Sequence, residues 1–122
     1  MPTLTFNALS DGWASTSGAA YTSVQSAGSA GVLQATGEVT EVNNGFAGGV
    51  YYIDRGMVFF DSTTLPAGAN ITSATISFKG KAKDDTDTFN VVLISGTALA
   101  NTIVDADYGE LLAATTSFGS IS

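Results

Sequence analysis

The side chains of this 122-residue chain that could carry chemistry are oxygen donors, because cysteine and histidine are both absent. Their absence excludes disulfides, thiolate nucleophiles, sulfur-ligated metals and the usual general base. The densest remaining group is the acidic cluster Asp84, Asp85 and Asp87. Calcium takes several oxygen ligands, and alternate carboxylates on a tight loop can provide them. The cluster is therefore a candidate structural calcium site. It lacks the twelve-residue EF-hand spacing, and Asp-rich turns also arise for conformational reasons alone.

A second acidic group, Asp105, Asp107 and Glu110, is a weaker metal candidate and is more typical of a solvated loop. Paired carboxylates can in principle hydrolyse glycosides. No two acids here are singled out on defined strands, and no nucleophile motif is present. We therefore expect a protein without catalytic activity.

Four aromatic residues are candidate glycan-binding platforms: Trp13, Tyr21, Tyr51 and Tyr52. Pyranose rings stack their apolar faces on flat aromatic rings, and the polar tips of Trp and Tyr add hydrogen bonds. For any single one of them, packing against the core is the stronger alternative. Trp13 is the exception that we expect, because it lies among small residues with little apolar context.

Two strands between residues 51 and 78 are expected to organise the chain. Met57, Val58, Phe59 and Phe60 place apolar side chains on both sides of the first strand, which predicts burial on both faces. Turn-forming residues follow at 61–70. The second strand is predicted to alternate, with Ala74, Ile76, Phe78, Gly80 and Ala82 toward the core and Ser73, Thr75, Ser77, Lys79, Lys81 and Lys83 toward solvent.

The other elements are shorter, and turn residues separate them. We expect a strand at 4–8, a turn at Asp11-Gly12, a surface loop at 13–29 with one strand near 20–24, a weaker strand within 31–42, a tight turn at 43–45, a buried strand at 88–95 and one helical turn within 98–113. Short strands with almost no helix predict a single all-β domain over residues 1–122. An antiparallel β-sandwich of jelly-roll type is the architecture that we favour.

The charge balance excludes some partners. A net charge of −7 and only four basic residues argue against nucleic-acid binding. Three of the four, Lys79, Lys81 and Lys83, share one strand face. They either protect an exposed edge or contact an acidic glycan or acidic neighbouring subunit. The fourth, Arg55, and Asp61 flank the apolar run of the first strand, and we expect a charge-assisted pair that holds the strand ends together rather than a ligand role.

Composition also bears on location. Only 12% of residues are charged, and the bias to small polar residues is typical of all-β surface and virion proteins. No run of about eighteen apolar residues exists that could span a membrane. The first residues lack a signal-peptide pattern. We expect a virion-surface or extracellular protein, either released by lysis or processed from a longer precursor.

Residues 55–61, 65–69 and 71–76 resemble the DNRLRE (disaggregatase-related) domains. That family's pattern has an Arg, an apolar strand closing in Phe-Asp, a Leu-Pro-x-Gly turn and an Ile-x-Ser-Ala-x-Leu strand. The resemblance implies a β-sandwich similar to carbohydrate-binding modules, as found on secreted polysaccharide-active proteins, cell-surface proteins and phage structural proteins. The short chain looks most like the phage type. The family extends further, so strands expected after Ile121 are missing, through processing or because another subunit supplies them by β-augmentation.

These observations predict a non-catalytic structural or adhesion module of a virion or cell surface, as a capsid decoration or fibre component with weak glycan binding. We expect it to associate with itself or with other surface proteins through strand edges. The alternative is a carbohydrate-binding module of a secreted polysaccharide-active protein.

Overall fold

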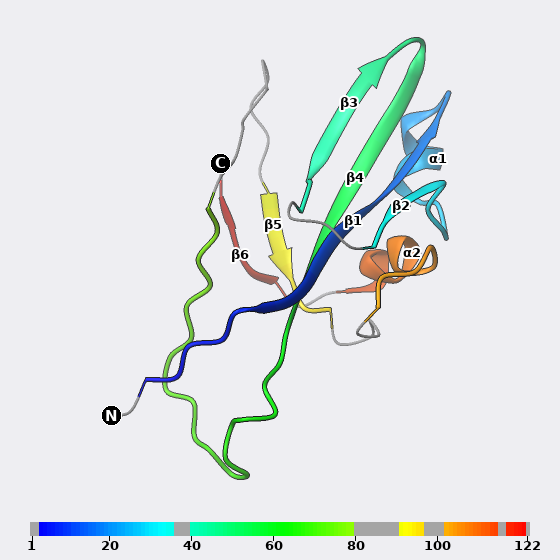
Figure 1. The fold of residues 1–122 in the computed structure, drawn as a ribbon. Helices are drawn as coiled ribbons and strands as arrows, with labels where there is room; N and C mark the ends of the chain where they lie inside the picture. Colours follow the sequence, from blue (N-terminus) through cyan, green and yellow to red (C-terminus); the bar gives the residue numbers. More distant parts are fainter. Residues whose placement is uncertain (1–2, 36–39, 80–90, 97–101, 115–116, 122) are drawn as a thin grey trace.

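Strands dominate the computed structural model, which describes residues 3–35, 40–79, 91–96, 102–114 and 117–121 (Figure 1). In order, the elements are β1 (Ala8–Gly18), α1 (Tyr21–Gln25), β2 (Val32–Gln34), β3 (Asn43–Ala47), β4 (Val50–Phe60), β5 (Val91–Ile94), α2 (Asp107–Ala113) and β6 (Ser117–Ile121). They form a four-stranded sheet of order β2-β1-β4-β3 and a two-stranded sheet of β5 and β6, both antiparallel. The all-β class is confirmed. Neither described helix is long and apolar enough to cross a membrane.

β4 forms where the sequence predicted an apolar strand, and it is one of the two inner strands of the four-stranded sheet, paired with β1 on one side and β3 on the other. The tight turn predicted at 43–45 is wrong, because these residues begin β3. The β3–β4 hairpin turns instead at Gly48 and Gly49, whose φ angles are +60° and +83°. Two successive positive φ values suit the right-handed twist of a two-residue hairpin, and glycine adopts them without steric cost.

Chain segments before β4 differ from the prediction. Of the strand expected at 4–8, only Ala8 belongs to a strand, and the turn expected at Asp11-Gly12 lies inside β1. A Cβ at Gly12 would overlap the Gln34 carbonyl oxygen and lie 2.8 Å from the Ile103 Cδ1 atom. Gly12 therefore permits close packing rather than a turn. The strand expected near 20–24 is also wrong, because α1 forms there and buries Val24.

Side-chain alternation gives the four-stranded sheet two distinct faces. Directly opposed residues in antiparallel strands point to the same side. The helix face, covered by α1 and α2 in Figure 1, carries Ala14, Ile53, Arg55 and Met57. The outer face carries Trp13, Ser15, Ser17, Tyr52, Asp54, Gly56 and Val58. The core lies on the helix face, where Ala14, Met57, Ile103 and Tyr108 are buried together.

The burial predicted for both faces of β4 holds only in part. Met57 is buried, Val58 and Phe59 are half-buried, and Phe60 is 42% exposed. The turn region that follows is confirmed. The Leu65 amide donates to the Ser62 carbonyl at 3.0 Å, and Gly68 has a positive φ of 76°.

The second alternating strand is not formed at residues 71–79, which are extended and exposed. Ala74, Ile76 and Phe78, expected in the core, all face solvent, with Ile76 44% and Phe78 59% exposed. Alternation sorts side chains onto two faces, but a strand also needs a hydrogen-bonded neighbour. Residues 80–83, the rest of this predicted strand, lie outside the described residues.

The C-terminal part combines a confirmed strand, a longer helix and an unexpected strand. β5 lies within the strand predicted at 88–95, but the burial predicted for that strand does not hold, because Val92 is 52% exposed. Its partner β6 was not predicted. The single helical turn expected in this region is the seven-residue helix α2. Gly109 within α2 permits close packing. A Cβ there would overlap the Gly28 carbonyl oxygen and lie 2.7 Å from the Gly28 carbonyl carbon.

Replacing Gly109 by alanine is expected to lower the free energy of unfolding, by about 1–2 kcal/mol. Helix propensity alone predicts the opposite, a gain of roughly 1 kcal/mol. Urea denaturation followed by circular dichroism measures the sign. Gly28→Ala is the matched control, because a Cβ at Gly28 meets no atom within 4 Å. A stabilised Gly109→Ala protein would contradict the close contact between α2 and Gly28.

Candidate functional site

The four predicted sugar platforms separate into two pairs. Tyr51 and Tyr21 lie on the helix side, with ring centroids 5.8 Å apart in an edge-to-face arrangement. Phe46 joins them, with its ring centroid 4.7 Å from that of Tyr51. Trp13 and Tyr52 share the outer face, as their register with β4 and β1 requires. The structure therefore does not bring all four together, and the outer face holds the pair without a helix over it (Figure 1).

Two glycines shape the outer face, one beside Tyr52 and one beside Trp13. A Cβ at Gly45 would overlap the ring of Tyr52, so Gly45 leaves the space in which that ring lies. A Cβ at Gly56, the cross-strand partner of Trp13, would lie 3.0 Å from the Glu41 carbonyl oxygen and 3.1 Å from Val42 Cγ2. Gly56 thus lets residues 40–42 pass closely over the sheet beside Trp13.

Asp54 lies on the outer face between the register positions of Trp13 and Tyr52, and it was not among the predicted site residues. Its cross-strand neighbours are Ser15 on β1 and Asn43 on β3, so three polar residues form a row across the sheet. Asp54 is only 8% exposed, and no hydrogen bond joins its carboxylate to another residue that the structure describes. An acid inside β4, two residues after Tyr52, was the sequence signal for it. We call Trp13, Ser15, Asn43, Tyr52 and Asp54 the outer-face site.

The acidic clusters have different outcomes. Asp84, Asp85 and Asp87 lie outside the described residues, so the calcium site there stays a prediction. In the second group, Asp105 and Glu110 are exposed. Within the described ranges, no group of three or more potential metal ligands is brought together.

Asp107, the third member of that second group, is buried, which corrects the expectation of a solvated loop. Its Oδ2 atom accepts a hydrogen bond from the Val104 amide at 2.8 Å. Asp107 therefore holds the turn that leads into α2. A carboxylate near the start of a helix is also favoured by the partial positive charge of that end.

The predicted pair between Arg55 and Asp61 is not formed. The Asp61 carboxylate accepts from the Thr63 amide at 2.9 Å, and this hydrogen bond lowers the pKa of Asp61. The Arg55 guanidinium instead lies 3.9 Å from the centroid of the Tyr108 ring. It donates to the carbonyl oxygens of Tyr108 and Gln25, the latter at 2.7 Å. Arg55 turns away from Asp61 because the helix face offers a ring and two carbonyls.

The contact between Arg55 and Tyr108 joins both helices to the sheet. The Tyr108 hydroxyl donates to the Val24 carbonyl oxygen of α1 at 2.9 Å. Burial lowers the pKa of Arg55, and the proximity of Tyr108 opposes that change. Burial also raises the pKa of the Tyr108 phenol, while the Arg55 charge opposes the rise. The sequence offered no signal for this contact, because its partners are 53 residues apart.

Comparison with known proteins gives no relative: no family model matches, and neither the curated proteins nor the solved structures include a match. The likeness to DNRLRE domains therefore stays a prediction from the residues quoted above.

Proposed function

We propose that this chain is a non-catalytic structural or adhesion module of a virion or cell surface, as a capsid decoration or fibre component that also binds glycan weakly. It is completed by strand pairing with a second copy, outside the cell or on the virion surface. In this proposal the two antiparallel sheets are parts of a jelly-roll sandwich. The observation that carries the proposal is the extended segment at residues 73–79.

Residues 73–79 have the sequence of a strand but no partner in the described structure. The alternation of Ala74, Ile76 and Phe78 with polar residues suits a sheet that is covered on one face. No hydrogen bond joins this segment to another described residue. Peptide groups that pair with no described residue, beside exposed apolar side chains, favour addition to another chain's sheet edge. Strand exchange between copies would provide hydrogen-bond partners for the peptide groups and would bury the apolar side chains.

Further exposed apolar side chains lie near the same part of the molecule. Residues 3–7 and 61–79 leave the four-stranded sheet at its end opposite the β3–β4 turn (Figure 1). Leu4, Leu9 and Ile71 are each more than half exposed in this region. A contiguous association surface needs such residues, whereas single exposed apolar residues are common on any protein. In such an assembly, the helix face of the four-stranded sheet would not take part in the contact.

The light-scattering mass of the purified chain, measured after size-exclusion chromatography, tests this proposal. We expect a discrete oligomer. The double variant Ile76→Ser/Phe78→Ser should weaken association by about tenfold or more, because apolar burial at the contact is lost. Leu112→Ser is the matched control, since Leu112 is exposed to a similar degree on α2 and should leave the mass unchanged. A monomer at every concentration, or equal loss in the control, would contradict strand pairing between copies.

The second candidate is a carbohydrate-binding module of a secreted polysaccharide-active protein. The placement of Trp13 and Tyr52 on one sheet face favours it. Such a module would be a folded monomer with affinity for a defined glycan. The same mass measurement separates the two candidates.

A further inference from the structure

We infer that the outer-face site binds an uncharged oligosaccharide, with one sugar unit on Trp13, another on Tyr52, and Asp54 accepting hydroxyl hydrogen bonds between them. This inference deepens the proposed function and depends on its glycan-binding part. It specifies the class of glycan, which the residue types alone did not.

The spacing of the two rings indicates an oligosaccharide. Trp13 is opposite Gly56, and Tyr52 is opposite Ser17, so the rings are four residues apart along the paired strands. Strand geometry separates them by roughly 13 Å in that direction. One pyranose ring cannot cover both. A chain of sugar units that follows the strands can stack on each ring and pass over the polar row between them.

The polar row supplies hydrogen bonds of the right kind. A carboxylate only accepts hydrogen bonds, and sugar hydroxyls donate them. Asp54 makes no hydrogen bond to the other described residues, and bonds to a charged acceptor are stronger than neutral ones. Ser15 and Asn43, on either side, can both donate and accept. Rigid strands hold all three residues, which favours a pre-organised site.

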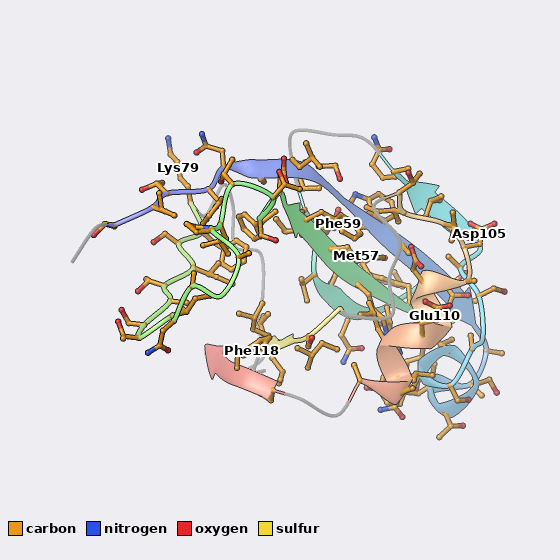
Figure 2. The ribbon with its side chains drawn as sticks, turned by 90° about the horizontal axis from the view of Figure 1, so that it is seen from below. Met57, Phe59, Lys79, Asp105, Glu110 and Phe118 are labelled. Carbon is orange, nitrogen blue, oxygen red and sulfur yellow. The ribbon has the colours of Figure 1, made fainter. Side chains whose placement is uncertain are left out.

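Charge selects against acidic glycans. The low exposure of Asp54 limits the screening of its charge by solvent, so an approaching carboxylate or sulfate is repelled. The described residues include two cationic side chains, Arg55 and Lys79, and neither is placed at the outer-face site. Arg55 points to the helix face and donates to carbonyl oxygens there. Lys79 lies in the segment at residues 61–79 that leaves the four-stranded sheet at the end opposite the β3–β4 turn (Figure 1 and Figure 2), whereas Tyr52 lies close to that turn.

Affinity gel electrophoresis tests the inference, with neutral polysaccharides (β-glucan, xylan, galactomannan) and acidic ones (polygalacturonate, alginate) as the probes. We expect at least one neutral probe to retard the chain and neither acidic probe to do so. Trp13→Ala and Tyr52→Ala should each weaken retardation about tenfold, since each removes one stacking ring. Tyr21→Ala is the matched control, an exposed aromatic on the helix side, and should bind like the unmodified chain.

Asp54→Asn provides the readout of charge selection. It should weaken binding to the neutral probe by about threefold to tenfold and reduce the exclusion of the acidic probes. Circular dichroism confirms the fold of each variant. If Trp13→Ala does not fold, Trp13→Leu keeps apolar bulk without a ring and serves instead.

The outcomes separate this inference from the structural role. Retardation by an acidic probe, or unchanged binding in both ring variants, overturns the inference. Absence of binding to every probe by a discrete oligomer also overturns it and leaves the structural role intact. Neutral binding by a monomer supports the inference and overturns the structural role.

Discussion

Replacing Tyr108 by alanine is expected to lower the free energy of unfolding by about 4 kcal/mol, the cost typical of truncating a buried aromatic residue. Tyr108 has 0% of its surface exposed and contacts the core residues Ala14, Met57 and Ile103. Its loss leaves a cavity between α2 and the sheet and removes the ring under Arg55. Since small domains are stable by only about 5–15 kcal/mol, this variant should be the least stable single substitution considered. Urea denaturation at neutral pH measures the change.

The hydroxyl of Tyr108 can be tested separately with Tyr108→Phe, which should cost about 1 kcal/mol because the Val24 carbonyl loses its donor. The pH dependence has a definite sign. Because burial raises the pKa of Tyr108 above its ordinary value of 10.0, the folded state favours the neutral phenol. The hydroxyl's contribution is therefore complete below about pH 10. It is lost as pH rises through the pKa of the folded state.

Comparison with Tyr108→Phe isolates this titration, because both proteins keep the other three tyrosines. The stability difference between them should shrink progressively above pH 10. Tyr21→Phe is the control, since Tyr21 is an exposed ring, and it should cost little. A stability difference that stays constant with pH would contradict the burial of an ionisable phenol at position 108.

Replacing Arg55 by methionine is expected to lower the free energy of unfolding by about 3 kcal/mol. Methionine keeps the length of the side chain but removes two charge-assisted hydrogen bonds, to the carbonyls of Tyr108 and Gln25. It also removes the cation–π contact with Tyr108, worth roughly 0.5–2 kcal/mol. Arg55 is only half-buried, so solvent screening keeps the loss below the sum of these contributions.

Arg55→Lys is the conservative variant, and it should cost about half as much as Arg55→Met. Lysine keeps the charge, but one ammonium lacks the planar fork that reaches two carbonyls while it stacks on a ring. Chemical denaturation of both variants gives their order. Equal stability of the lysine variant and the unmodified chain would show that charge alone, and not the fork, holds α1 and α2 to β4.

Local signals were sufficient for several elements. The apolar run of β4 was predicted because a strand's propensity and length can be read from consecutive residues. The turn after Phe60 was predicted because Asp61, Pro66 and Gly68 each favour turns through their own backbone or short-range hydrogen bonds. The short helix after Asp105 was also detected, although one turn too short. In each case the cause lies within a few residues of the effect.

Other features required neighbours that are distant in the chain. Gly12 was expected in a turn, yet Gly12 and Gly109 are both sites where a second backbone approaches closely. The alternating residues 73–79 were expected to form a strand with one face in the core, but alternation does not determine whether a neighbouring strand is present. Arg55 was assigned to Asp61 because of its position in the chain, while the helices supplied other partners.

The sequence by itself therefore determined the strand-rich class, the apolar strand β4 and the acidic net charge, because composition and short-range periodicity carry that information. Only the tertiary structure decided which side chains meet. Alternation along β4 separates Tyr52 and Asp54 from Tyr51 and Arg55, and the register of β1 with β4 added Trp13 to the face of Tyr52 and Asp54. A shift of one residue in that register would put Trp13 on the opposite face, and no local pattern in β1, rich in small polar residues, specifies the register strongly.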